Sequence, residues 1–288
     1  MATVNHGHLV TRAAIASVIT ASVLLLAKTG AWSASDSASV LSSLLDSLMD
    51  IAASVINFFA IRFALVPPDE DHPFGHSKAE GLAALMQSAF ILGSVTMLLL
   101  HLLDRIVKPV ELQALPESIG VMAFSTIATL LLVLYQRYVY RKTGSLAVKA
   151  DSAHYLGDIL TNIAVIFALV GAMLGFIWLD IVVAVIVALT LTFSVINIAR
   201  EALAVLMDQA LDPDDEARLI KTIQETDGVK GFHDLKTRQS GMVQFIQFHL
   251  ELDGDQLLRD AHDTGRSLEA KIRERFPRAE VIIHHYPV

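Results

Sequence analysis

The sequence predicts a polytopic α-helical membrane protein with six transmembrane helices, followed by a small ferredoxin-like α/β domain. Of its 288 residues, 53% are hydrophobic and 18% are charged, whereas a soluble domain carries about 25% charged residues. The charge is also unevenly distributed, because residues 209–288 hold 15 of the 30 acidic and 11 of the 22 basic residues. We therefore expect a charge-poor transmembrane domain at 1–208 and a charged domain at 209–288.

Six stretches of the first part are long and apolar enough to cross a bilayer, which takes roughly 20 apolar residues. They lie at about 9–32, 36–62, 80–104 and 117–137, and as a pair between 149 and 200 that a turn near Gly175 separates. Pro116 suits the first turn of the fourth helix, where its missing N–H is tolerated. The first stretch lacks a clear small-residue cleavage site, so we expect a retained helix and not a signal peptide.

The basic residues near the helix ends predict that both termini lie in the cytoplasm. In this orientation the cytoplasmic ends carry more Lys and Arg than the opposite ends, as the positive-inside rule requires. The cytoplasmic set is Arg12, Arg62, Lys78, Arg137, Arg141, Lys142, Lys149 and Arg200, and the opposite set is Lys28, Arg105 and Lys108. An even number of spans then leaves the charged domain in the cytoplasm.

The charged domain is expected to have the element order αββαβ. Acidic residues at 212–216 open a helix, because carboxylates in the first turn complement the helix dipole. Strands follow near 229–238 and 242–252, joined by a Ser240-Gly241 turn, and the alternation in the second is typical of a half-buried strand. A helix near 255–276 and a strand near 279–286 complete a ferredoxin-like sandwich.

The composition excludes several kinds of site and partner. The chain has no cysteine, which excludes disulfides, thiolate zinc sites, iron–sulfur clusters and thiol catalysis. Its net charge of −8 argues against nucleic acid as the main partner. Metal binding must therefore depend on the 11 histidines and on carboxylates.

Ionisable residues lie inside two of the predicted spans. Asp46 and Asp50 are near the middle of the second span, and the fifth contains Asp151, His154 and Asp158. In the pairs 46/50 and 154/158 the members are four residues apart, so both side chains share one helix face. A charge at the bilayer centre costs about 2.5–3.5 kcal/mol on insertion scales. Adjacent like charges cost more unless a cation or a proton compensates them.

Three of these carboxylates and the imidazole supply four oxygen and nitrogen ligands, which a tetrahedral zinc site accepts. The two helices would have to face each other, and small residues near the ligands would let them approach. These small residues are Ser43, Ser47, Ala53, Ser54, Ala153 and Gly157. The alternative is that the acids only hydrogen-bond neighbouring helices, which leaves the matched spacing of the two pairs unexplained.

Two further groups of histidines are candidate metal ligands. Asp69, His72 and His76 follow the second span at steps of three and four residues, which suits zinc, although a solvated polar loop is the alternative. In the charged domain, adjacent strands could bring several histidines together, whereas any one alone is more often a surface or packing residue. That set is His233, His249, His262, His284 and His285.

Three segments carry a family resemblance. They read LDSLMD at 45–50, DEDHPFGHSKAE at 69–80 and DSAHYLGD at 151–158. With the six spans and the charged domain, they resemble the cation diffusion facilitator family, most closely its bacterial zinc/ferrous-iron efflux members. The resemblance implies a homodimer that exports divalent metal from the cytoplasm against inward proton flow. It also implies that the transported ion binds Asp46, Asp50, His154 and Asp158.

The same resemblance extends to the remaining groups. It implies a second metal site at Asp69, His72 and His76, and a Lys78–Asp208 pair that locks the dimer. It further implies a two-ion site between the cytoplasmic domains, whose positions match His233, His249, His262 and His284. One position departs from the pattern, because close relatives have an aspartate where this chain has Tyr286. Either His285 substitutes for it, or one ion is lost or weakened.

The predicted function is therefore proton-coupled antiport of divalent metal in a cell inner membrane, with an intracellular vesicle membrane as the other location. Zn²⁺ is the expected cargo, because histidine ligands favour zinc or Cd²⁺ over manganese, and Fe²⁺ uses similar ligands. A membrane-anchored metal sensor or scaffold without transport is the alternative, although it would not need carboxylates at mid-membrane. An intramembrane metalloprotease is not expected, since the chain has no His-Glu-x-x-His pair.

Overall fold

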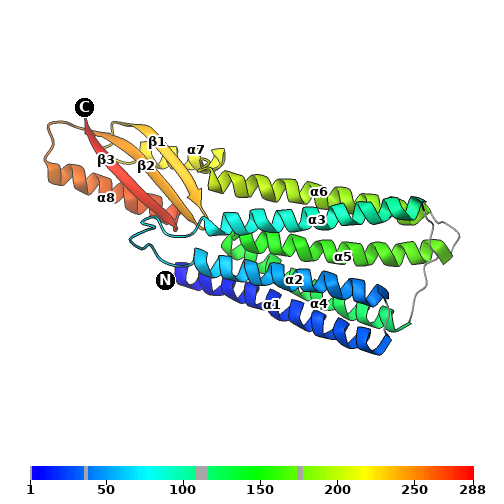
Figure 1. Ribbon diagram of the computed structural model, residues 1–288. Coiled ribbons are helices and arrows are strands. Elements are labelled where there is room, and N and C mark those ends of the chain that lie inside the picture. The colour runs from blue at the N-terminus through cyan, green and yellow to red at the C-terminus, as the bar shows by residue number, and fades with distance from the viewer. Residues whose placement is uncertain (1, 36–37, 108–115, 174–177) are drawn as a thin grey trace. The chain divides into compact units, whose positions relative to one another are not determined.

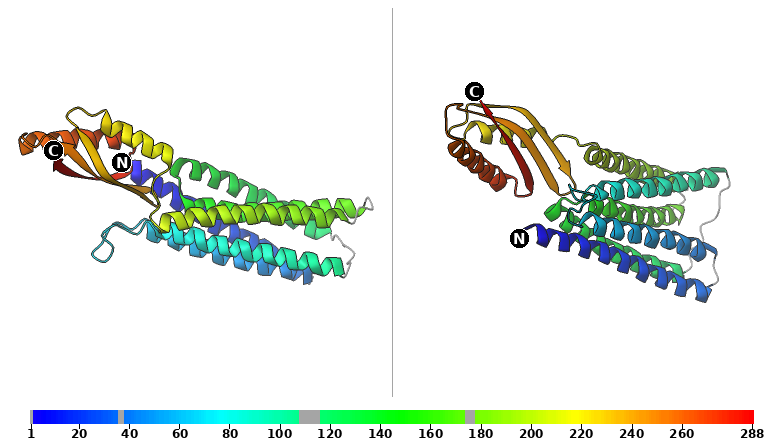
Figure 2. Two further views of the ribbon diagram at one scale, coloured as in Figure 1. Left: turned by 90° about the horizontal axis from the view of Figure 1, so that it is seen from above. Right: turned by 60° about the vertical axis from the view of Figure 1, so that its left-hand side comes forward.

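The computed structural model describes residues 2–35, 38–107, 116–173 and 178–288. The chain forms two compact units, Met1–Leu203 and Ala204–Val288. In the first unit, long helices lie side by side and run along a common direction (Figures 1 and 2). These are α1 (Ala2–Ser35), α2 (Ala38–Ala64), α3 (Ala79–Val107), α4 (Pro116–Thr143), α5 (Leu146–Met173) and α6 (Trp178–Leu206).

Five of these helices, α1, α2, α3, α4 and α6, contain a segment long and apolar enough to cross a membrane. Helix α5 has 28 residues and packs against both α3 and α4. Its polar residues Asp151, His154 and Asp158 lower its hydropathy, although it is as long as α4. The predicted helical transmembrane domain is therefore confirmed, with α5 as the sixth helix and Pro116 at the start of α4.

Small and hydroxylated residues determine how closely α5 approaches its neighbours. A Cβ atom added at Gly157 would lie 3.2 Å from Leu191 Cδ2 of α6. The absence of a side chain at Gly157 therefore leaves room for Leu191. Leu191 belongs to an apolar cluster of α3, α5 and α6 that also contains Ile91 and Ala164. The contact between α2 and α5 includes a 2.7 Å hydrogen bond between the hydroxyls of Ser54 and Tyr155. Gly157 thus serves the α5–α6 contact and not the predicted approach of α2 to α5.

The second unit contains α7 (Pro213–Gln224), β1 (Gly231–Ser240), β2 (Val243–Leu252), α8 (Leu258–Arg275) and β3 (Ala279–Pro287). This order confirms the predicted αββαβ arrangement. The sheet order is β1-β2-β3, in which β1 and β2 are antiparallel and β2 and β3 are parallel. Gly241, with φ of +55°, lies in the short turn between β1 and β2, and a left-handed residue suits such a turn.

Both helices of this unit pack on the same face of the sheet. Alternation along β2 directs Phe248 and Leu250 to that face, where they meet Leu219 of α7 and Leu268 and Ile272 of α8. The other face carries the polar members of the alternation, including Gln247, His249 and Glu251. We call this the open face of the sheet, and it carries a cluster of histidines.

The packing predicts a large difference between two apolar truncations in the sheet. Leu250→Ala removes a side chain that is 0% exposed, so it should lower the free energy of unfolding of this unit by about 2–5 kcal/mol. The measurement is hydrogen exchange of the β2 backbone amides in the intact, detergent-solubilised chain.

Ile282→Ala is the matched control, because Ile282 lies in β3 and is 57% exposed. It should change the same free energy by no more than about 0.5 kcal/mol. Equal effects of the two substitutions would contradict the assignment of the core face.

Candidate metal-binding sites

The first candidate site joins α2 to α5 within the helical unit. His154 Nε2 lies 3.1 Å from Asp50 Oδ1, and the two side chains are 8% and 19% exposed. Asp158 completes a group in which each residue offers a ligand atom within 4.8 Å of the others. A tetrahedral zinc ion with bonds of about 2.0–2.2 Å holds neighbouring ligand atoms about 3.3–3.6 Å apart. The three side chains are therefore spaced for a shared ion after only small movements.

Asp46 lies one turn before Asp50 but has a different setting. Its side chain is exposed, and it is not a member of the compact group of Asp50, His154 and Asp158. Four residues of helix correspond to about 400°, so the directions of the two carboxylates differ by about 40°. A change of side-chain rotamer would be needed for Asp46 to act as a fourth ligand.

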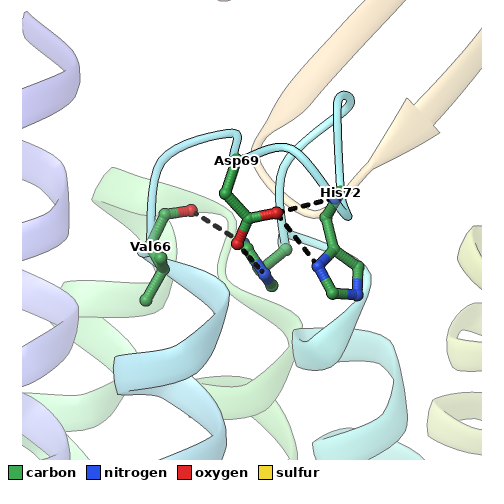
Figure 3. Close-up of polar contacts among 4 residues, drawn as sticks. Val66, Asp69 and His72 are labelled. Atoms are coloured by element: carbon green, nitrogen blue, oxygen red, sulfur yellow. Dashed lines mark hydrogen bonds and ion pairs between the residues drawn. The ribbon is translucent and has the colours of Figure 1, made fainter.

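The second candidate site is the loop between α2 and α3, where Asp69 lies between two imidazoles. The backbone N–H of His72 donates to Asp69 Oδ1 at 2.6 Å, and His72 Nδ1 lies 3.2 Å from the same oxygen (Figure 3). His76 Nε2 lies 3.3 Å from Asp69 Oδ2. The two imidazole rings are 4.4 Å apart. All three predicted ligands are thus brought together.

The polar contacts of this loop prepare the side chains for metal binding. The backbone N–H of His72 lowers the pKa of the Asp69 carboxyl, which keeps it ionised at neutral pH. His76 Nδ1 lies 3.3 Å from the Val66 carbonyl and can donate its proton there. The lone pair of Nε2 then points toward Asp69, which is the arrangement that a hydrogen bond behind a metal-binding histidine produces.

The third candidate site lies on the open face of the sheet in the second unit. In the strand register, His233 of β1 is paired with His249 of β2, and His249 with His284 of β3. His233 Nε2 and His249 Nδ1 are 3.2 Å apart, and the rings of His249 and His284 are 4.8 Å apart. Three predicted ligands from three strands therefore form one row.

A carboxylate that sequence reasoning did not select joins this row. Asp234 belongs to a compact group with His233 and His249, and its carboxylate lies 3.9 Å from His249 Nδ1. Consecutive strand residues ordinarily point to opposite faces. Here the register shifts between His233 and Lys236, and Asp234 has φ of +53°, so this bulge places neighbouring side chains together. In the sequence, the only indication that Asp234 belongs to this group was its position next to His233.

Glu251 holds His233 in position from the neighbouring strand. Its Oε1 lies 2.7 Å from His233 Nδ1, so that nitrogen can donate while Nε2 faces His249. Glu251 is paired with Gly231, and a Cβ atom at Gly231 would collide with the Glu251 carboxylate. A side chain at Gly231 would therefore displace the carboxylate from this position beside His233. Glu251 was also missed by sequence reasoning.

The remaining histidines of this unit lie elsewhere. The His285 ring lies against Gly265 of α8, and its centroid is 6.5 Å from that of His262. Burial and the neighbouring imidazoles lower the pKa of His285. Among the described residues, neither His262 nor His285 joins the group on the open face. Tyr286 does lie on that face, with its ring 4.9 Å from the ring of His233.

The two members of the predicted dimer lock lie in different units of the chain. Asp208 accepts a 3.0 Å hydrogen bond from Arg238 Nη1 within the second unit. Lys78 is half-buried just before α3. Their pairing across a dimer stays a prediction.

Comparison with known sequences identifies the family. Residues 14–207 match the cation efflux transmembrane domain, and residues 211–288 match the cytoplasmic domain of cation efflux proteins. The chain belongs to the cation-efflux family. The two matches fall on the two units described above and confirm the resemblance seen in the sequence.

Individual relatives extend the match over almost the whole chain. The cation-efflux pump FieF of Serratia proteamaculans is 44% identical over 283 residues, which are 98% of this chain and 94% of the relative. FieF of Klebsiella pneumoniae is 43% identical over the same proportions. A solved structure of CzrB in its zinc form is 34% identical and covers 28% of this chain and 92% of that one, with a TM-score of 0.27.

The geometry of the open face predicts that Asp234 is a metal ligand. In a chain that also carries Asp50→Asn and Asp69→Asn, Asp234→Asn should weaken zinc binding by at least about tenfold, because the amide removes a charged ligand. Isothermal titration of zinc into the purified chain measures this affinity.

Asp227→Asn is the matched control, since Asp227 is an exposed carboxylate of the same unit and is outside the group. It should leave the affinity unchanged. If both substitutions have the same effect, Asp234 is not a ligand.

Proposed function

We propose that this chain is a proton-coupled antiporter that exports divalent metal cations from the cytoplasm, with zinc as its main cargo. The proposal depends on one observation, the group of Asp50, His154 and Asp158 between two helices of the transmembrane unit. Ionised groups at such a depth are costly, and a divalent cation compensates two carboxylates at once. A membrane-anchored sensor or scaffold without transport would have no use for them.

The choice of zinc follows from the mixed donor set. Imidazole with carboxylates suits zinc, whereas a set of oxygen ligands alone suits magnesium, calcium or manganese. Cadmium and ferrous iron accept similar donors and are the competing cargoes. Asp46 is proposed as the fourth ligand, reached by rotation of its side chain when the ion binds.

Proton coupling follows from competition for the same atoms. A carboxylate or imidazole that accepts a proton can no longer bind metal. Imidazole ordinarily titrates closest to neutral pH of all side chains, so His154 is proposed to exchange metal for a proton in each cycle. The chain contains no cysteine, so every proposed ligand is one that protons displace readily.

The other sites have regulatory and structural roles in this proposal. The loop of Asp69, His72 and His76 binds a second metal ion, and the open face of the cytoplasmic sheet senses metal. We propose a homodimer in a cell inner membrane with both termini in the cytoplasm, in which Lys78 and Asp208 pair between subunits. Metal that bridges two cytoplasmic units would then shift the population of transport states. In the dimer, His262 and His284 of facing subunits would add ligands to the open-face group.

Reconstituted vesicles give a direct test of the transport site. Asp50→Asn should lower zinc flux by at least about tenfold, because it removes one charged ligand from the group. Flux is followed with a zinc-sensitive dye inside the vesicles, and the same assay with Fe²⁺, Cd²⁺ and Mn²⁺ ranks the cargoes.

Asp71→Asn changes an exposed loop carboxylate and serves as the control, for which wild-type flux is expected. Wild-type flux in the Asp50→Asn variant would remove the transport proposal. Zinc binding without flux in the wild-type protein would favour the sensor.

The pH dependence of flux tests the role of His154. In His154→Asp, a carboxylate that ordinarily titrates near pH 4 replaces an imidazole that titrates near about 6.5. The midpoint of the pH dependence should therefore move to lower pH, since metal competes with protons at a more acidic group. A pH-jump uptake assay over a series of pH values measures the midpoint.

His8→Asp is the control for this experiment, because His8 is exposed near the N-terminus. Its profile should match the wild type. An unchanged profile in His154→Asp would show that another group carries the exchanged proton.

A further inference from the structure

Four helices of the transmembrane unit meet at a second polar cluster that contains no candidate metal ligand. It consists of Ser17 of α1, Asn57 of α2, Gln136 of α4 and Asp151 of α5, whose side chains are 0%, 2%, 0% and 1% exposed. Asp151 lies three residues before His154 on α5, but it is not part of the group of Asp50, His154 and Asp158. The proposed transport mechanism does not use this cluster.

One oxygen of the Asp151 carboxyl is fully engaged. Ser17 Oγ donates to Asp151 Oδ2 at 2.5 Å, and Gln136 Nε2 donates to the same oxygen at 2.6 Å. Gln136 Nε2 also lies 2.8 Å from Ser17 Oγ. The Asn57 side-chain amide donates a hydrogen bond to the carboxyl from α2. Helices α1, α2, α4 and α5 are thus all connected through one carboxyl group.

The other atoms of the cluster lack a donor. Asp151 Oδ1, Gln136 Oε1 and Asn57 Oδ1 are buried and have no hydrogen-bond partner. Amide oxygens and ionised carboxylate oxygens only accept hydrogen bonds, so these three atoms cannot bond to one another. Unpaired polar atoms at full burial are strongly unfavourable. The three unpaired acceptor atoms indicate that the cluster contains an additional hydrogen-bond donor.

The surroundings of Asp151 supply no fixed positive charge from Lys or Arg. Among the described residues, its hydrogen-bond partners are the neutral side chains of Ser17, Gln136 and Asn57. The ionisable groups nearby are both on α5, namely His154 and Tyr155. The Tyr155 hydroxyl is held by Ser54 Oγ at 2.7 Å and the Ser17 carbonyl at 3.4 Å. An ionised Asp151 would therefore be a poorly compensated charge inside the bundle.

We propose that Asp151 is a proton-binding site that carries a resident proton on Oδ1. For this proton, the Asn57 amide turns over from the orientation in which its N–H₂ group faces the carboxyl. The neutral acid then donates from Oδ1 to the Asn57 amide oxygen, while Oδ2, as the carbonyl oxygen, accepts from Ser17 and Gln136. The added proton makes Oδ1 a donor, so two of the three unpaired atoms pair with each other, and no ion is required. Because Gln136 directs its Nε2 toward the carboxyl, Asn57 is the acceptor of the added hydrogen.

This proton differs from the one proposed to exchange for metal. It is held by residues outside the metal group, so it should stay in place when zinc binds. The neutral cluster fixes α5, which carries His154 and Asp158, against α1, α2 and α4. The resident proton does not depend on transport activity, and only the protonation state of the Asp151 carboxyl decides whether it is present.

Infrared difference spectroscopy of the intact purified protein tests the proposal. At about pH 8, exposed carboxyl groups are ionised, so a carbonyl stretching band of a protonated carboxylic acid reports a buried one. The difference between wild type and Asp151→Asn should contain this band as a positive signal from the wild type. Asp50→Asn should keep the band, and adding zinc to the wild type should leave it unchanged.

Three results would overturn the proposal. The first is the absence of the band from the difference spectrum, which would show an ionised Asp151. The second is its loss when zinc is added, which would make the proton an exchanged one. The third is a wild-type melting temperature that rises with sodium in place of choline at constant ionic strength, which would show a bound cation instead.

Asp151→Asn should fold, because its amide group donates where Oδ1–H does. If it cannot be purified, Asn57→Leu gives an independent measurement in which the Asp151 band shifts in frequency, since the acceptor of its proton is gone. An unshifted band in Asn57→Leu would contradict the assignment.

Discussion

The structure of the transmembrane unit is constrained by the cost of holding ionised side chains away from water. Each carboxylate there needs a nearby positive charge, a proton or a metal ion. Asp50 has the imidazole of His154 at 3.1 Å. The group of Asp50, His154 and Asp158 has two carboxylates for one imidazole. This excess of negative charge would favour a cation at the candidate site.

In two of the candidate metal sites, the histidines are oriented in the same way. One ring nitrogen hydrogen-bonds to an oxygen outside the site, and the other faces the candidate ligands. The Val66 carbonyl does this for His76, and the Glu251 carboxylate does it for His233. Such contacts set the tautomer and the direction of the lone pair before metal arrives. The rings of His76 and His233 are therefore already oriented as ion binding would require.

Much of the architecture follows from patterns that are local in the sequence. Hydrophobic length identifies the helices, because a bilayer requires a run of about 20 apolar residues. Strand alternation places His249 on the polar face of β2, because successive side chains alternate. The contact between Gly157 and Leu191 was not predictable in this way, because a small residue can admit any neighbour. Asp151 could be recognised as a polar residue in a span, but its partners Ser17, Asn57 and Gln136 are dispersed over three other helices.

The sequence by itself determined the element order, the membrane character and the residue types able to bind metal, since these depend on composition and on local spacing. It also paired Asp50 with the helix of His154 through matched spacing, which the structure brings within hydrogen-bonding distance. Only the tertiary structure separated His262 and His285 from the open-face histidines, because sheet pleating and helix packing decide which face each occupies. It also added Asp234, because a bulge reverses the ordinary alternation of side chains, and no spacing rule in the chain encodes where that bulge forms.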